Sequence, residues 1–200
     1  GYGEHNIQGI GDKHVPLIHN VMNTDFVVGI TDKATNNLNM IFNTDIGQKY
    51  LNIKKGFEID FINRLPEFGF SAIANILASI KLAKYMKLGK DDAIVTVATD
   101  GADLYLSELN KTKAEFRGVY DETACGEIFG QYLKGISTDN TLELNQNDKE
   151  RIFNLGYYTW VEQQGISTND FEKRRNQNFW NEHYRYMLSL DDRISDFNSI

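Results

Sequence analysis

Cysteine is almost absent from the sequence, since Cys125 is the only one in 200 residues. One thiol cannot form an internal disulfide or a thiolate metal cluster, so we expect a reducing, cytoplasmic location. Long apolar runs are also missing, because none approaches the roughly 20 residues of a membrane-spanning helix. Positive charge is scarce, with 21 lysines and arginines against 28 acidic residues and a net charge of −7. General nucleic-acid binding requires a basic face, and this charge balance argues against it.

The common motifs for metal binding and nucleophilic catalysis are missing as well. The four histidines include no pair at i,i+4 spacing, and no cysteine or carboxylate pattern completes a zinc site; they are His5, His14, His19 and His183. A site built from His14, His19 and Asp12 is conceivable, but we expect no metal. Cys125 lies among acidic neighbours on a predicted helix, which favours a buried, inert thiol over a nucleophile.

The first hundred residues predict an α/β arrangement. Residues 1–24 read as a loop, and the β-branched segment 25–31 reads as a buried strand. One helix is predicted from a cap at Asp32 to about Asn43, and a second from a cap at Thr44-Asp45 to a point before Gly56. Ser71 opens the strongest helix, which is apolar around most of its circumference, and Gly89 ends it. A second buried strand, residues 93–98, follows.

A strand, a helix and a second strand in this order predict a right-handed crossover and a parallel sheet. The fold class is therefore α/β, with few parallel strands flanked by helices. Two parallel strands cannot bury both faces of a sheet. We therefore expect that the remaining strands come from elsewhere, or that part of the protein is missing.

Only helices are predicted from Asp103 onward, over residues 104–116 and 122–134, then from about residue 147, and from a capping box at Ser167 to about residue 188. An amphipathic tail over residues 191–200 follows. These patterns predict two parts, an α/β domain over residues 1–116 and a helical extension packed on it over residues 117–200.

Two loops are candidate binding segments. In Gly9-Ile10-Gly11 the two glycines let the backbone approach a flat ligand closely. Thr99 and Asp100 follow the predicted strand 93–98 and precede Gly101, and ligands bind at the carboxyl ends of strands in open parallel sheets. Each loop has an alternative interpretation as an ordinary turn.

Three stretches of the sequence together resemble a known family. NIQGIGDKHVP, DFVVGITD and FGFSAIANILASIKLAKYMKLGKDDAIVTVATDGADLYLSE occur in this order. They are similar to the C-terminal half of the cysteine synthase family, the fold-type II enzymes that use pyridoxal 5′-phosphate. The resemblance covers about residues 5–108. The helices beyond residue 116 look like the extension of a longer, related group.

The resemblance implies a role for particular residues. Ser71 falls where the family places the hydroxyl that hydrogen-bonds the pyridine nitrogen of the cofactor, although it can also be an ordinary N-cap. A neutral partner leaves that nitrogen unprotonated, which favours β-elimination over transamination. Gly9, Ile10 and Gly11 would line the cofactor, and Thr99 with Asp100 would flank its ring. The sequence departs from the family pattern at residues 12–14 and 99–101, which leaves the amino-acid substrate open.

The family's Schiff-base lysine, substrate-carboxylate loop and phosphate cradle precede the matched region, so we expect them outside this chain. The chain would then be the C-terminal fragment of a lyase or transferase that acts on an amino acid by β-replacement or β-elimination and forms a homodimer. The alternative is a non-catalytic companion subunit, which would bind a partner through helices that carry Tyr157, Tyr158, Trp160, Phe179 and Trp180.

Overall fold

The computed structural model describes residues 4–7, 9–11 and 14–199 and divides the chain into two compact units. The first unit comprises residues 1–12 and 28–141, and the second comprises residues 13–27 and 142–200. The predicted boundary after residue 116 falls inside the first unit.

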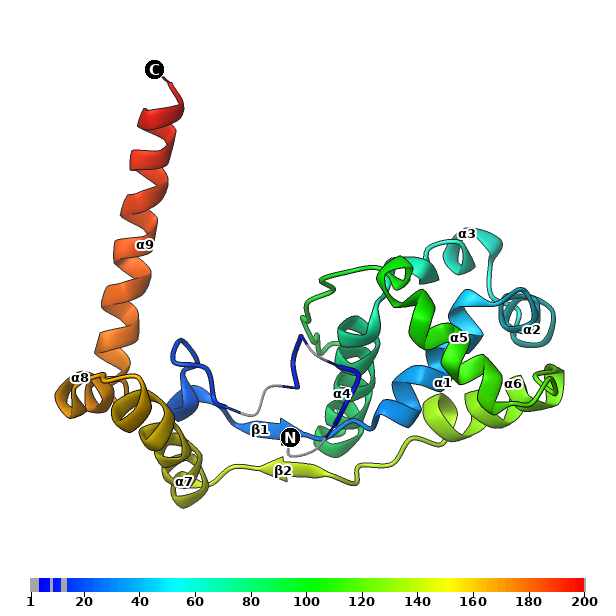
Figure 1. Ribbon diagram of the computed structural model, residues 1–200, viewed down its shortest axis with the longest axis horizontal. Coiled ribbons are helices and arrows are strands. Elements are labelled where there is room, and N and C mark those ends of the chain that lie inside the picture. Colours follow the sequence, from blue (N-terminus) through cyan, green and yellow to red (C-terminus); the bar gives the residue numbers. More distant parts are fainter. Residues whose placement is uncertain (1–3, 8, 12–13, 200) are drawn as a thin grey trace. The chain divides into compact units, whose positions relative to one another are not determined.

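Helices build the first unit (Figure 1). They are α1 (Asp32–Asn43), α2 (Asp45–Lys55), α3 (Ile59–Ile62), α4 (Phe70–Met86), α5 (Leu106–Glu115) and α6 (Glu122–Phe129). A π-helical turn, Gly130–Lys134, continues α6. Short 3-10 helices lie at Leu65–Glu67 and Ala102–Tyr105.

Local sequence explains where the first helices begin and end. Thr31, not Asp32 as the sequence suggested, caps α1, because its hydroxyl accepts a hydrogen bond from the Ala34 amide. Thr44 caps α2 in the same way through the Gly47 amide, as predicted. Gly56 ends α2 with a φ of 72°, a left-handed conformation that glycine adopts without strain.

The core of the first unit lies between α1, α2, α4 and α6. Leu38 and Ile41 of α1 meet Ile73 and Leu77 of α4 in one buried cluster, and Cys125 of α6 is buried in it. The first residues of α4, from Phe70 to Ala74, are buried on every side, which explains their apolar composition, whereas Tyr85 and Met86 at its end are exposed. The prediction of a buried thiol at Cys125 is confirmed.

The second unit is also helical. It contains α7 (Gln146–Tyr157), a π-helical continuation (Tyr158–Gln163), α8 (Thr168–Lys173), α9 (Gln177–Asn198) and a 3-10 helix at Val21–Asn23. Its small core joins Val21, Phe153 and Phe171. Ser167 caps α8 as predicted, by accepting a hydrogen bond from the Asp170 amide.

The predicted α/β fold with parallel strands is wrong. The structure is mostly helical, and its one sheet in the described residues has two short antiparallel strands, β1 (Phe26–Val28) and β2 (Thr141–Glu143). Hydrogen bonds from the Gly29 amide to the Asn140 carbonyl and from the Leu144 amide to the Asp25 carbonyl flank this pair. The predicted strand 93–98 has no regular secondary structure. An apolar, β-branched run identifies a segment that suits a sheet, but a strand also needs a neighbour to pair with.

No helix in the described part of the chain is both long enough and apolar enough to cross a membrane.

Candidate functional site

The start of α4 brings the predicted site residues together. Phe70 and Ser71 form its first turn, and both are buried, with Ser71 only 3% exposed. Gly9 lies against Ser71, because a Cβ atom at position 9 would stand 2.7 Å from the Ser71 Oγ. Residues 9–11, called the glycine loop from here on, are therefore in contact with the start of α4. Gly9 and Ser71 are 62 positions apart in the sequence.

Asp100 also contacts the start of α4. Its carbonyl accepts a hydrogen bond of 2.8 Å from the Gly69 amide. Its carboxylate accepts hydrogen bonds from the Tyr105 hydroxyl and, at 3.2 Å, from the Thr99 hydroxyl. One turn further along α4, the Asn75 amide donates to the Val97 carbonyl over 2.9 Å. The segment before Gly101 is thus fixed to the first two turns of α4.

Tyr105 completes this cluster. Its ring stacks on Phe70 with 4.5 Å between the ring centroids. Burial raises the pKa of Tyr105 to about 12, and the hydrogen bond to Asp100 and the charge of that carboxylate add to the effect. At neutral pH the phenol is therefore a hydrogen-bond donor that keeps Asp100 in place.

The glycine loop is held by short-range contacts and by α1. The Gly11 amide donates to the Ile7 carbonyl over 3.0 Å, and a side chain at position 11 would collide with the His5 ring. The Asn6 amide donates to the Asp32 carboxylate over 2.9 Å, which ties the loop to the first turn of α1. Glycine is needed at position 11 because the histidine ring occupies the space of a Cβ.

A cavity of about 350 Å³ adjoins this loop and one face of α4. Its walls are mainly apolar, with Glu4, His5, Asp32 and Asn75 as the polar side chains. Ile10 and Gly11 line it, whereas Gly9, Ser71, Thr99 and Asp100 are not among its lining residues. This volume is within the range of small-molecule sites. The structure therefore places the predicted residues in one neighbourhood, and two of the six in a cavity wall.

The residues of this region fit the pyridine ring of pyridoxal phosphate but not its phosphate group. The backbone of Ile10 and Gly11 and the apolar wall suit a flat heteroaromatic ring, whereas the buried Ser71 hydroxyl does not line this cavity. Among the described residues that line the cavity there is no lysine or arginine, and Glu4 with Asp32 would repel a phosphate group. The phosphate has to be held by residues that this wall does not provide.

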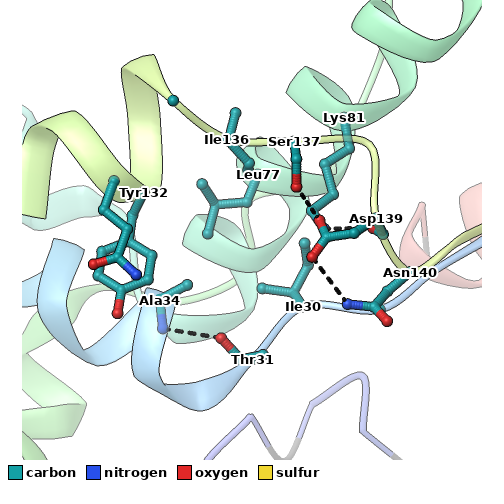
Figure 2. Close-up of a pocket in the computed structure, with 13 residues that line it drawn as sticks. Ile30, Thr31, Ala34, Leu77, Lys81, Tyr132, Ile136, Ser137, Asp139 and Asn140 are labelled. Atoms are coloured by element: carbon teal, nitrogen blue, oxygen red, sulfur yellow. Dashed lines mark hydrogen bonds and ion pairs between the residues drawn. The ribbon is translucent and has the colours of Figure 1, made fainter.

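A second cavity, of about 250 Å³, lies on another face of α4 (Figure 2). Lys81 of α4 and the segment Ser137–Asn140 form its polar part. Lys81 is 6% exposed, and its ammonium donates to the Asp139 carboxylate over 2.7 Å and to the Asp139 carbonyl over 2.6 Å. The sequence did not predict this ion pair between a buried lysine and an exposed aspartate.

The Asp139 side chain is 64% exposed, in contrast to that of Lys81. Hydrogen bonds from Lys81 and from the Ser137 hydroxyl hold the pKa of Asp139 below its usual range. An ammonium group held by a carboxylate is a charge partner and not a free amine nucleophile. The arrangement fixes the segment 137–140 to α4, and the cavity beside it is lined by Thr31 and Tyr132 as well.

The sequence carries one signal that could have located Lys81. Ile73, Leu77 and Lys81 follow each other at i,i+4 spacing, and the first two are fully buried. A lysine on the most buried stripe of an apolar helix requires a partner, because an unpaired buried charge is costly. The partner, Asp139, lies 58 positions further along the chain and could not be identified from the pattern.

The remaining candidates contribute little to a site. Burial, with the nearby charges of Asp121 and Glu122, raises the pKa of the Cys125 thiol, which opposes nucleophilic chemistry. No group of three histidine, cysteine or acidic side chains among the described residues is arranged to hold a metal ion. Asp12, part of the conceivable metal site, lies outside the described residues. Trp160 packs on the core of the second unit, and its indole donates to the Val15 carbonyl.

Comparison of the chain with protein-family models, with curated proteins and with solved structures finds no match, so the similarity to the cysteine synthase family remains a resemblance.

Proposed function

We propose that the chain supplies one wall of a pyridoxal phosphate site in an enzyme that acts on amino acids by β-replacement or β-elimination. The observation that supports this proposal is the convergence of three separate segments. The resemblance implies cofactor contacts at residues 9–11, Ser71 and residues 99–100, and all three segments meet at the start of α4. When bound, the cofactor withdraws electrons from the substrate's α-carbon.

The residues of this wall have distinct roles in the proposal. The Ser71 hydroxyl hydrogen-bonds the ring nitrogen, and as a neutral group it does not hold that nitrogen protonated. The backbone of Gly9 and Gly11 lies along the ring. Asp100, fixed by Tyr105 and Gly69, positions the segment beside the ring. Ser71 is buried beneath Gly9, so a ring reaches the hydroxyl only by entering between the loop and α4.

The other wall has to come from outside this chain in the proposal. The acidic lining of the cavity leaves the phosphate without a cation, and Lys81 is engaged by Asp139. A second polypeptide segment would supply the phosphate cradle and the lysine that attaches the cofactor and moves the α-proton. The alternative, a non-catalytic companion subunit, is supported by the exposed apolar segment 93–98, with which no strand of the described residues pairs.

Equilibrium dialysis of the 200-residue chain against pyridoxal phosphate tests the proposal, followed by borohydride reduction and mass spectrometry of the peptides. We expect weak binding that Ser71→Ala reduces, with no single lysine labelled to one equivalent. Ser107→Ala is the matched control, because Ser107 is also the second residue of its helix but is exposed on α5.

Two results would contradict the proposal. One is equal binding to the Ser71→Ala and Ser107→Ala variants, because the ring would then lie elsewhere. The other is stoichiometric labelling of one lysine, because the attachment residue would then belong to this chain.

A further inference from the structure

The segment Ala93–Ala98 has the composition of a buried strand and the surroundings of a surface loop. Its sequence, AIVTVA, is uncharged, and four successive residues, 94–97, are β-branched. All six residues are exposed, with Val95 at 95% and Val97 at 64%. The odd-numbered and the even-numbered side chains, which point to opposite faces of an extended segment, are all exposed to water. Neither face is therefore covered.

The backbone of this segment is also unpaired with any other backbone among the described residues. Among the described residues, no backbone–backbone hydrogen bond involves positions 93–98, and the contact from Asn75 to the Val97 carbonyl comes from a side chain. Both ends are nevertheless anchored. Gly89 and Asp92 form a turn through two hydrogen bonds, and the Asp100 carbonyl is bound by Gly69. A short segment fixed at both ends loses less conformational entropy when it pairs than a free one does.

Exposed backbone donors and acceptors along an apolar, β-branched segment select one kind of ligand, which is another extended backbone. We infer that residues 93–98 accept a strand from a partner polypeptide and become an interior strand of a sheet that the partner completes. The inference does not depend on the cofactor proposal, since it rests on the exposure and hydrogen bonding of this segment alone.

The charges next to the segment disfavour a second copy of this chain as the partner. In an antiparallel pair with Ala93 opposite Ala98 of the copy, Asp91 would lie opposite Asp100 at both ends of the ribbon. In a parallel, in-register pair, Asp91 and Asp92 would each face their own equivalents. Like charges directly opposite one another destabilise a strand pair. A two-stranded ribbon would also leave both faces of the segment in water.

The same charges define the partner's chemistry. Its strand carries uncharged, β-branched residues opposite positions 93–98, and basic residues opposite Asp91, Asp92 and Asp100. Because both faces of the segment are exposed, the partner also brings apolar residues that cover these faces. The partner is thus a polypeptide with a basic-ended apolar strand, distinct from a copy of this chain.

Amide hydrogen exchange on the full chain tests this inference with synthetic peptides as probes. The first peptide has a Val-Thr-Val-Ile-Val-Thr centre with two lysines at each end. The second has the same centre with two glutamates at each end, and the third is the first with alternate amides N-methylated. We expect the lysine-ended peptide to slow exchange of amides 93–98 by about tenfold or more at saturation. The glutamate-ended peptide should protect less, and the N-methylated peptide should not protect.

Two substitutions distinguish strand pairing from non-specific hydrophobic binding of the peptide. Val95→Lys should abolish protection by the lysine-ended peptide, while the far-ultraviolet circular dichroism stays unchanged because Val95 is almost fully exposed. Val119→Lys is the control, because Val119 is exposed in a different loop and should leave protection intact. Protection of amides 93–98 in the chain alone that grows with its concentration would overturn the inference in favour of a second copy. Equal protection by the lysine-ended and N-methylated peptides, or no protection by any peptide, would also overturn it.

Discussion

Gly9 lies directly against Ser71, so that a Cβ atom at position 9 would stand 2.7 Å from the Ser71 Oγ and 3.7 Å from its Cβ. The close approach therefore involves the hydroxyl and not the rest of the serine side chain. This contact joins the glycine loop to the first turn of α4, beside the buried cluster of Ile7 with Phe70 and Ala74.

Replacement of Gly9 by alanine should destabilise the protein through this contact. We expect Gly9→Ala to lower the free energy of unfolding by about 1–2 kcal/mol, the usual cost of overpacking. In a Ser71→Ala background the cost should fall by at least about 0.5 kcal/mol, because the atom that the new methyl group meets is gone. Urea denaturation of the four proteins measures the coupling.

Gly130→Ala is the matched control for this cycle. Gly130 lies at the end of α6, and a Cβ atom there would meet nothing within 4 Å. We expect it to be neutral or stabilising, because alanine favours the helix. Purely additive effects of Gly9→Ala and Ser71→Ala would contradict the contact.

The Tyr105 hydroxyl should lose its proton at a higher pH than an ordinary tyrosine. Its pKa of about 12 predicts a tyrosinate absorbance step well above the ordinary value near 10. The step is identified as the difference between the titrations of the parent protein and of Tyr105→Phe. Asp100→Asn should lower the pKa of Tyr105 by removing a negative charge, although burial keeps it above 10.

The stability that Tyr105 contributes has a defined pH window. The folded state holds the phenolic proton more tightly than the unfolded state, so the contribution is complete below pH 10 and is lost as the pH rises toward 12. Tyr105→Phe should therefore show a shallower loss of stability over this range. Parallel stability curves of the two proteins between pH 9 and 11.5 would disprove the raised pKa.

The two partners of the Lys81–Asp139 ion pair should respond unequally to substitution. Lys81→Met leaves an exposed carboxylate in water and fills the buried position with an apolar chain, so we expect a change within about 1 kcal/mol. Asp139→Asn leaves the buried ammonium without its carboxylate and should lower the melting temperature more. Lys113→Met, on the exposed surface of α5, is the control. A larger effect of Lys81→Met than of Asp139→Asn would contradict this assignment.

The Lys81–Asp139 ion pair also predicts that the stability of the protein falls at low pH. The folded-state pKa of Asp139 is lowered, so its contribution is present above the unfolded value near 3.9 and is lost as the pH falls below it. Thermal melts of the parent and of Asp139→Asn should differ at pH 6 and converge toward pH 2. A constant difference between the two melting temperatures would indicate that the carboxylate charge is not involved.

Local features of the sequence predicted much of the helical structure. The caps at Thr44 and Ser167 and the glycine end of α2 depend on neighbours within a few residues, and the structure has them where the sequence placed them. The start of α4, within one residue of Ser71, and the burial of its first residues follow from the distribution of apolar residues, but the helix ends at Met86 and not at Gly89. The convergence of residues 9–11, 71 and 99–100 was anticipated by the resemblance and not by any pattern in their spacing.

Features that depend on distant partners were not predictable. The segment 93–98 satisfies every local rule for a strand, yet it lacks the neighbour that would make it one. β2 lies in a polar stretch that gave no strand signal, and it forms because Thr141–Glu143 meets β1. Lys81 finds Asp139 through the tertiary fold. The last two depend on contacts between residues more than 50 positions apart.

Backbone amide spectra of the isotopically labelled chain, recorded during titration with pyridoxal phosphate, test the central claim most directly. The account predicts saturable shifts confined to residues 9–11, 69–75 and 99–101, and their loss in Ser71→Ala but not in Ser107→Ala. Shifts centred instead on Lys81 and Asp139, or spread over exposed lysines with no saturation, would contradict it.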